Sequence, residues 1–328
     1  MAKKKICVIA TGGTIASRPT ENGLMPALTG EDILDLVPEI RALADVSCVQ
    51  LLQLDSSNLL PQHWQSMART VAVAIGQYDG FIVTHGTDTM AYSAAALWYM
   101  LQNVPCPVVF TGSQLPAGVP GSDAEQNLLT AFHAALSGRP GVYLAFGGRI
   151  LFGNSARKLC TRQLTAFGTI QRPVAGTYAG GRLVWDLPAV KPVGKFRLRD
   201  QLDTKVGVLK LVPGLPPKML KLFVDEGFHA LIVEGYGMGG IPDQESPLDF
   251  LPTLAYARDN GCLIVCTTQC VYDGADLDHY EMGVRAQRLG VIPGGDLCTE
   301  ALLPRLMLLL AETRDAAYIR SQLQKEEG

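Results

Sequence analysis

The 328-residue sequence lacks the long apolar runs that mark membrane and secreted proteins. No stretch reaches the ~18 consecutive apolar residues of a membrane span, because Pro304-Arg305 interrupts the longest C-terminal run. Only five apolar residues, Ile6 to Ala10, follow Lys3-Lys4-Lys5, which is too few for the core of a secretory signal. We therefore expect a soluble, cytoplasmic protein that does not contact a membrane.

Metal-ligand and nucleophile motifs are also scarce. The sequence contains no G-x-S-x-G, no H-E-x-x-H and no CxxC pair, so the esterase and metallohydrolase classes lose their main support and no metal is expected. Its eight cysteines are sparse and predict thiols outside disulfides. Cys262, Cys266 and Cys270 are four residues apart, but the first two bound an apolar run typical of a strand, where that spacing does not assemble a metal site. We expect these three side chains in the buried core.

Charge of either sign is limited. Charged residues make up 18% of the chain, and 28 Lys and Arg against 31 Asp and Glu leave a formal net charge of −3. Nucleic-acid-binding proteins usually carry a basic face or stripe, whereas the longest basic run here is Lys3-Lys4-Lys5. Nucleic acid is therefore not expected as a partner. Hydrophobic residues make up 48%, enough for a globular core, and the length suits about two domains.

Short apolar runs that end in small or polar residues predict strands buried on both faces. Helical patterns lie between them: Pro61 suits the first turn of a helix with Trp64 and Met67 on its apolar face, and Ser122 with Glu125 fits a capping box. This alternation predicts an α/β fold, with a parallel sheet flanked by helices and ligands at the carboxyl ends of its strands. The predicted strands are residues 6–10, 81–83, 108–110 and 142–146.

The composition changes after residue 187. Residues 188–203 contain two prolines, a glycine and four basic residues with weak periodicity, which predicts a linker. We therefore expect an N-terminal catalytic domain over 1–187 and a smaller C-terminal α/β domain over 204–328. The second domain has predicted strands at 206–211, 230–233 and 263–266 and an apolar helix near 301–311.

Two polar segments follow predicted strands and carry hydroxyl groups. In Ala10–Ala16, paired glycines let the backbone turn tightly and leave amide N–H groups unshielded beside Thr14. The alternatives are an ordinary turn or a phosphate loop, although the segment lacks the sequence signatures of phosphate loops. The second segment contains Asp55, Ser56 and Ser57, which also fit a plain cap and turn.

Two further segments supply candidate acid–base groups. In Thr84–Ala91, Thr87 or Asp88 would be an ordinary helix cap, and His85 is either a base or a hydrogen-bonded structural residue. The segment Asn154–Lys158 ends in a lysine, which acts as a base only if burial or a nearby cation helps it to lose its proton.

Taken together, Ala10–Ala16, His85–Ala91 and Asn154–Lys158 occur in the order, and at the strand ends, seen in the bacterial-type L-asparaginases, and the chain resembles the cytoplasmic type I branch of that family. The first two segments are similar to the family's two threonine signatures. The similarity extends along the chain through residues 111–114, 122–128, 267–270 and 294–296.

The resemblance implies hydrolysis of L-asparagine to L-aspartate and ammonia through a threonine acyl-enzyme, without a cofactor. Thr14 matches the family nucleophile on a mobile lid, and Thr87, Asp88 and Lys158 match its second catalytic triad. The same resemblance implies a substrate site in which Asp88 takes the ammonium of asparagine and Ser56, with Ser57 beside it, binds the carboxylate. Glutamine is one methylene longer, a difference worth only about 1–3 kcal/mol, so a glutaminase side activity stays open.

The sequence departs from the family at two places. The lid contains Gly23-Leu24-Met25-Pro26, where many relatives carry a tyrosine that orients the nucleophile. Gly240 stands where relatives place an asparagine that supports the site across a subunit interface, as expected for a homodimer or homotetramer. Two other functions remain as alternatives: the amidase subunit of a tRNA-dependent transamidase, whose members have an extra N-terminal domain, and a non-catalytic asparagine or aspartate sensor.

Overall fold

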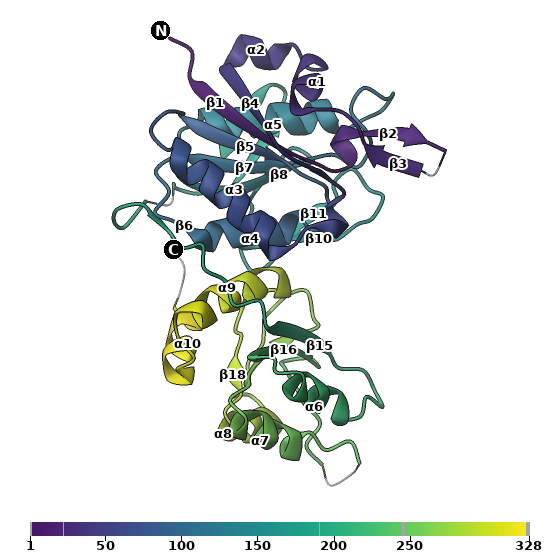
Figure 1. The fold of residues 1–328 in the computed structure, drawn as a ribbon, viewed down its shortest axis with the longest axis vertical. Helices are drawn as coiled ribbons and strands as arrows, with labels where there is room; N and C mark the ends of the chain where they lie inside the picture. Colours follow the sequence, from purple (N-terminus) through teal and green to yellow (C-terminus); the bar gives the residue numbers. More distant parts are fainter. Residues whose placement is uncertain (1, 22, 190, 245–246, 326–328) are drawn as a thin grey trace. The chain divides into compact units, whose positions relative to one another are not determined.

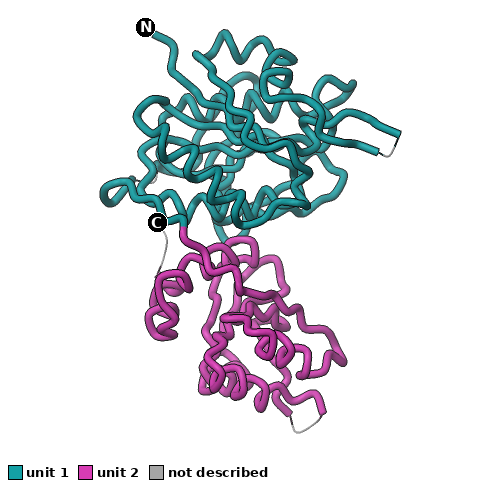
Figure 2. Tube along the Cα trace, viewed as in Figure 1, with its two compact units in different colours: residues 1–200 teal, residues 201–328 magenta. Residues whose placement is uncertain are grey.

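The computed structural model describes residues 2–21, 23–189, 191–244 and 247–325. The chain divides into two compact units, residues 1–200 and 201–328 (Figure 2). Each unit has its own sheet and its own hydrophobic core, and the predicted α/β class is confirmed. The boundary falls within residues 188–203, and the role of that segment as a linker stays a prediction.

The sheet of the first unit is parallel through five neighbouring strands, in the order β8-β7-β5-β1-β4 (Figure 1). Every residue of β5 and β7 is buried, as the continuous apolar runs predict. All four predicted strands of this unit are confirmed. The parallel strands are β1 (Lys5–Gly12), β4 (Asp45–Leu54), β5 (Gly80–Thr84), β7 (Pro107–Thr111) and β8 (Gly141–Phe146).

Three antiparallel strands, which the apolar runs did not predict, extend this sheet beyond β8: β9 (Arg149–Phe152), β12 (Gly176–Ala179) and β13 (Arg182–Trp185). The cause is the connection between β8 and β9, which is the pair Gly147 and Gly148 with φ of 57° and 75°. Two residues with positive φ form a hairpin turn, whereas a parallel crossover needs a dozen or more residues.

Helices cover the sheet of the first unit. One hydrophobic core cluster includes Ile6 and Val8, which point to one face of β1. The same cluster includes buried residues of α1 (Gly30–Asp35), α2 (Glu39–Leu43) and α5 (Ala124–Leu136). The predicted helix that opens at Pro61 is confirmed as α3 (Pro61–Ala74), which packs against α4 (Met90–Met100). The smaller elements are η1 (Thr14–Ala16), η2 (Ser56–Asn58), β6 (Leu101–Gln102), β10 (Ala156–Lys158), β11 (Phe167–Thr169) and β14 (Arg197–Leu198).

The start of α5 differs from the prediction. The N-cap residue is Asp123 rather than Ser122, so the Ser122–Glu125 capping box is wrong. Ser122 Oγ does accept a hydrogen bond from Ala124 N, at 3.1 Å. The Asp123 carboxylate does not cap its own helix, because it accepts hydrogen bonds from the backbone amides of Gln114 and Leu115 instead.

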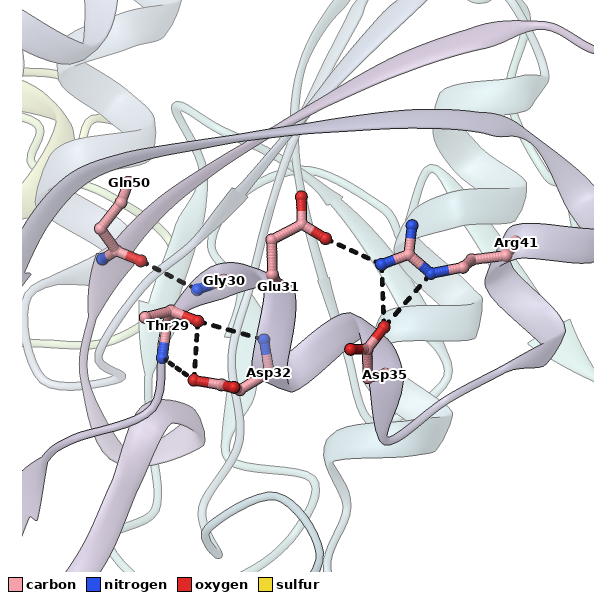
Figure 3. A network of polar contacts seen from close by, with 7 residues as sticks. All are labelled: Thr29, Gly30, Glu31, Asp32, Asp35, Arg41 and Gln50. Carbon is pink, nitrogen blue, oxygen red and sulfur yellow. Dashed lines mark hydrogen bonds and ion pairs between the residues drawn. The ribbon is translucent and has the colours of Figure 1, made fainter.

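A hairpin of β2 (Ser17–Thr20) and β3 (Gly23–Pro26) projects from the first unit in Figure 1. Its base is fixed, because the amides of Ala27 and Leu28 both donate to Ala16 O at 2.8 Å. The chain then enters α1 through a capping box in which Thr29 and Asp32 bind each other's backbone amides (Figure 3). The segment that contains the predicted lid is therefore anchored at both ends.

The second unit contains a parallel sheet of β15 (Val206–Lys210), β16 (Ala230–Gly235), β17 (Leu263–Thr268) and β18 (Ile292–Pro293). The three strands and the apolar helix predicted there are confirmed, the helix as α9 (Thr299–Glu312). Cys262 and Cys266 are buried as predicted, but Cys270 is exposed because it lies beyond the end of β17. The remaining helices are α6 (Lys218–Asp225), α7 (Leu251–Asp259), α8 (Glu281–Arg288) and α10 (Ala316–Leu323).

Among the described residues, no helix combines the length and the apolar character needed to cross a membrane.

Candidate functional site

Two glycines bring separate loops into contact at the carboxyl edge of the first sheet. Gly13 has a φ of 80°, and a Cβ on it would lie 2.3 Å from both Cα and N of Gly86. A Cβ on Gly86 would in turn lie 2.6 Å from Ser56 Oγ. Only glycine permits approaches this close. Since Thr14 and Thr87 directly follow these two glycines, the structure brings the loops of Thr14, Ser56 and Thr87 together at one edge.

A lysine bridges the side chains of Thr87 and Asp88. Lys158 Nζ donates hydrogen bonds of 2.7 Å to Thr87 Oγ1 and of 2.7 Å to Asp88 Oδ1. Thr87 is buried, the Lys158 side chain is 18% exposed, and the Asp88 side chain is 60% exposed. The hydroxyl of Thr87 donates to Gln114 Oε1 at 3.2 Å. The arrangement places an amine within hydrogen-bond distance of both a hydroxyl and a carboxylate, which suits proton transfer.

The position of Lys158 follows from the strand that carries it. β10 pairs with β11 in antiparallel fashion, with Lys158 opposite Phe167. The preceding turn is held by Ile170 N, which donates to Ser155 O at 2.7 Å, and by the hydroxyls of Ser155 and Thr169, 3.1 Å apart. Asn154, at the start of this turn, accepts a hydrogen bond from Arg172. A short paired strand therefore fixes the direction of the lysine side chain.

The helix-cap interpretation of Thr87 and Asp88 is wrong. The N-cap of α4 is Thr89, without a side-chain capping bond, and the Thr89 hydroxyl donates to Ser56 O at 2.8 Å. Asp88 pairs with Lys158 instead. Asp55 does act as a local cap, accepting from the amide of Ser57 at 2.8 Å, so the cap-and-turn interpretation of this segment holds. Ser56 is buried against Gly86, and Ser57 is exposed.

Thr14 opens the short helix η1 that leads into the β2–β3 hairpin. Its side chain is half-buried, and no hydrogen bond of its hydroxyl occurs within the part of the chain that the structure describes. The tight turn before it is held by Ser17 Oγ, which donates to Gly13 O at 2.9 Å. Leu24 and Met25 of the hairpin are 55% and 57% exposed and carry no hydroxyl.

His85 has a structural role. The indole N–H of Trp64 can only donate, and it donates to Ser93 Oγ. Gly86 O can only accept, so His85 Nδ1 carries the proton and donates to it. His85 Nε2 is then the acceptor of the hydrogen bond from Ser93 Oγ. Both ring nitrogens of the neutral imidazole are therefore satisfied. Burial lowers the pKa of His85 to about 4, which keeps the ring uncharged. The buried ring supports the loop that carries Thr87.

The loop after β7 and the helix α5 that follows it contain residues that share the family resemblance but had no predicted role. The side chain of Gln114 accepts the hydrogen bond of Thr87, and the backbone N–H of Gln114 donates to the Asp123 carboxylate. Asn127 is fully buried, donates to Gly112 O and Asp123, and accepts from Gly147 N. The sequence position of Gln114 could have indicated a role in the site, because Gln114 follows a predicted strand that ends at the same edge of the sheet.

In the second unit, Gly240 lines a cavity of about 830 Å³ that follows the carboxyl end of β16. Tyr236 and Gly240 exchange two backbone hydrogen bonds of 2.9 and 2.7 Å. A Cβ on Gly240 would lie 2.9 Å from the sulfur of Met282, so a larger residue would require that side chain to move. Among the described residues of the chain, no group of three His, Cys, Asp or Glu side chains is arranged to hold a metal ion.

Comparisons with known proteins agree along the whole chain. The family described as "Asparaginase, N-terminal" matches residues 5–191, and "Glutaminase/Asparaginase C-terminal domain" matches residues 205–323. An L-asparaginase of Thermococcus kodakarensis is 40% identical over 98% of this chain and 97% of the relative. A glutamyl-tRNA(Gln) amidotransferase subunit of Pyrococcus furiosus is 34% identical over 94% of this chain and 73% of the relative.

Solved structures show the same likeness. The thermostable L-asparaginase of Thermococcus kodakarensis superposes with a TM-score of 0.92, covering 98% of this chain and 97% of that chain, at 40% identity. L-asparaginase I of Vibrio cholerae superposes with a TM-score of 0.87, covering 99% and 98%, at 29% identity.

Proposed function

Because the chain belongs to the asparaginase family, we propose that it hydrolyses L-asparagine to L-aspartate and ammonia through an ester formed on a threonine. The observation that carries the proposal is the 2.7 Å contact between Lys158 Nζ and Thr87 Oγ1 at the sheet edge that Thr14 shares. An alcohol is a weak nucleophile until a base removes its proton. Water that hydrolyses the resulting ester needs a base in the same way, and the Lys158 amine beside the Thr87 hydroxyl supplies that base.

The first step is assigned to Thr14. Its oxygen bonds to the side-chain amide carbon of asparagine, the hydroxyl proton passes to the amide nitrogen, and the C–N bond breaks. An aspartyl ester remains on Thr14 and ammonia leaves. Negative charge that develops on the carbonyl oxygen is stabilised by backbone N–H groups of the glycine-flanked turns before Thr14 and Thr87.

Thr87, Asp88 and Lys158 serve the second step. Lys158 in its uncharged form takes a proton, through the Thr87 hydroxyl, from a water molecule that attacks the ester carbon. The ester C–O bond breaks, the oxygen of Thr14 regains a proton, and aspartate leaves. Before the transfer, the Thr87 hydroxyl is held in place by its 3.2 Å hydrogen bond to Gln114 Oε1, and its hydrogen turns from Gln114 to Lys158 when the transfer begins.

The substrate is held by its two charges. Asp88 uses Oδ1 for Lys158 and is 60% exposed, so its second oxygen is available to the ammonium of asparagine. Ser56 and Ser57 lie on the neighbouring loop and bind the α-carboxylate.

The test is ammonia release from L-asparagine by the purified protein and by Thr14→Ala and Thr87→Ala. Thr177→Ala is the matched control, because Thr177 is an exposed threonine of β12. We expect both site variants to lose activity by at least about 100-fold and the control to keep it. Full activity in both site variants overturns the proposal. The same assay with L-glutamine measures the side activity that a one-methylene difference leaves open.

A second function is favoured by the 34% identity to the amidotransferase subunit of Pyrococcus furiosus. A protein of that kind would release ammonia only with a partner subunit and tRNA present. Ammonia release from L-asparagine by the protein alone therefore decides in favour of the first function. Tight binding of asparagine without any turnover would instead indicate a sensor.

We also propose that the protein works in the cytoplasm as a homodimer or homotetramer. All eight cysteines lie among the described residues and none forms a disulfide, which suits a reducing compartment. Light scattering on the purified protein measures the oligomeric state, and a monomer would contradict that part of the proposal.

A further inference from the structure

We propose that the second unit binds an anionic small molecule with an apolar body, in a cavity at the amino-terminal edge of its sheet. The cavity has a volume of about 610 Å³. Small-molecule sites typically have volumes of about 300–1,000 Å³. All the residues that line this site belong to the second unit, and the site serves a ligand other than asparagine.

The position of the cavity follows from the parallel sheet. Lys205 and His229 line it directly before β15 and β16, and Cys262 and Gly290 line it before β17 and β18. The amino ends of all four strands therefore meet there. The cavity that Gly240 lines follows the carboxyl end of β16, so the two cavities of this unit lie at opposite edges of one sheet.

The lining carries positive charge that the protein does not fully neutralise. Among the described residues, three cationic side chains line the cavity, Lys205, Arg258 and Arg314, and no acidic side chain does. Within the described part of the chain, the Lys205 ammonium has no hydrogen-bond or ion-pair partner. Arg258 pairs with the neighbouring Asp259 at 2.8 Å. An anion that enters the cavity therefore meets at least one unpaired charge and two guanidinium groups with further N–H donors.

Arg314 is oriented by a short chain of contacts. Asp203 Oδ2 lies 2.6 Å from His229 Nδ1, so that nitrogen carries the proton that it donates to the carboxylate. His229 Nε2 is then an acceptor, and a guanidinium nitrogen of Arg314 lies 3.0 Å from it. The same nitrogen lies 3.1 Å from His229 Nδ1 and forms an ion pair with Asp203 Oδ2 at 3.9 Å, which is too long for a direct hydrogen bond. The Asp203 carboxylate is thus hydrogen-bonded to the histidine, and the Arg314 guanidinium keeps further N–H donors for a ligand.

The rest of the lining is apolar. Val224, Phe228, Leu254 and Leu289 line the same cavity as the basic side chains. Phe228 packs edge-on against Phe223, with ring centroids 5.1 Å apart, which fixes its ring. A bare inorganic anion would satisfy the charges and leave this surface unused. The combination fits a phosphate or carboxylate group attached to an apolar or aromatic body.

The test is isothermal titration calorimetry of the full chain with phenyl phosphate and, separately, with inorganic phosphate. Phenyl phosphate supplies a charged group and an aromatic body, and inorganic phosphate supplies the charged group alone. The variants are Lys205→Ala and Arg314→Ala, both at exposed residues. Lys210→Ala is the matched control, because it removes the same charge from an exposed residue at the other end of β15.

We expect saturable binding of phenyl phosphate, tighter than that of inorganic phosphate, that weakens by at least about tenfold in Lys205→Ala and Arg314→Ala and stays unchanged in Lys210→Ala. Equal binding by all four proteins overturns the proposal, as does the absence of saturable binding to the unmodified protein. Equal affinity for the two probes overturns the assignment of an apolar body. Asparagine hydrolysis is measured on the same samples, so its loss and the loss of anion binding are distinguished.

Discussion

Replacing Lys158 by methionine separates catalysis from stability. Methionine keeps an unbranched chain of similar length and removes the ammonium group. Two hydrogen bonds of 2.7 Å disappear, one to Thr87 Oγ1 and one to Asp88 Oδ1. The first belongs to the proposed proton transfer, and the second is an ion pair with a carboxylate that is 60% exposed.

The two losses differ in size. A positioned general base contributes about 10²–10⁴-fold to a rate, which is about 3–5 kcal/mol of barrier. An ion pair to an exposed carboxylate contributes about 0–1 kcal/mol to folding. Thr87 keeps its bond to Gln114, so its buried hydroxyl is not left without a partner. We therefore expect kcat for L-asparagine to fall by about 10²–10⁴-fold, while Tm falls by no more than about 2–4 °C.

The assay is steady-state ammonia release, with Tm measured on the same samples by calorimetry. Lys4→Met is the matched control, because Lys4 also donates a 2.8 Å hydrogen bond, to Leu136 O, from the surface of the first unit. We expect the control to keep both kcat and Tm. The reasoning is refuted if Lys158→Met keeps kcat within about threefold of the original protein, or if its activity is lost only because the protein unfolds.

Three further predictions concern the support of the site and the surface thiols. Gly13→Ala places a Cβ 2.3 Å from the Gly86 backbone at a φ of 80°, so thermal denaturation should show a loss of at least about 3 kcal/mol, and an unchanged Tm would contradict the glycine contact. The folded-state pKa of His85 is about 4, below the ordinary 6.5, so the unfolded chain binds more protons than the folded chain between these two pH values. Urea titrations should therefore show about 3 kcal/mol of stability that is present above pH 6.5 and is lost as the pH falls to 4. The part of this loss that is due to His85 should vanish in His85→Gln. Thiol labelling of the native protein should modify exposed Cys270 well before buried Cys266, whose pKa burial raises to about 12, and equal rates would contradict this assignment.

The strands of the first unit were predictable because their apolar runs are continuous. Every residue of β5 and β7 is buried, so these strands are continuous apolar runs rather than an alternation of apolar and polar residues. The hairpin between β8 and β9 was missed although its signal is present. Gly147-Gly148 follows the apolar run 142–146 directly, and two glycines between apolar runs favour a hairpin.

The candidate site was predictable in its location and only partly in its contacts. Thr87 and Asp88 fitted a helix cap equally well, because threonine and aspartate are among the common capping residues. Their partner, Lys158, lies 70 residues away from Asp88 in the sequence, so no local pattern could reveal the contact, and only the family resemblance grouped the three residues. Asp123 was missed for the same reason, since its carboxylate binds Gln114 and Leu115 across a loop rather than its own helix.

The most direct measurement of the central claim is the capture of the ester itself. Lys158→Met turning over L-asparagine is quenched in acid within its first turnovers, digested, and mapped by mass spectrometry. Our account predicts an aspartyl group on the peptide that contains Thr14, accumulating because water is no longer activated to remove it. An aspartyl group on the Thr87 peptide would reverse the roles of the two threonines. Ammonia release with no aspartyl group on either peptide would contradict a covalent mechanism.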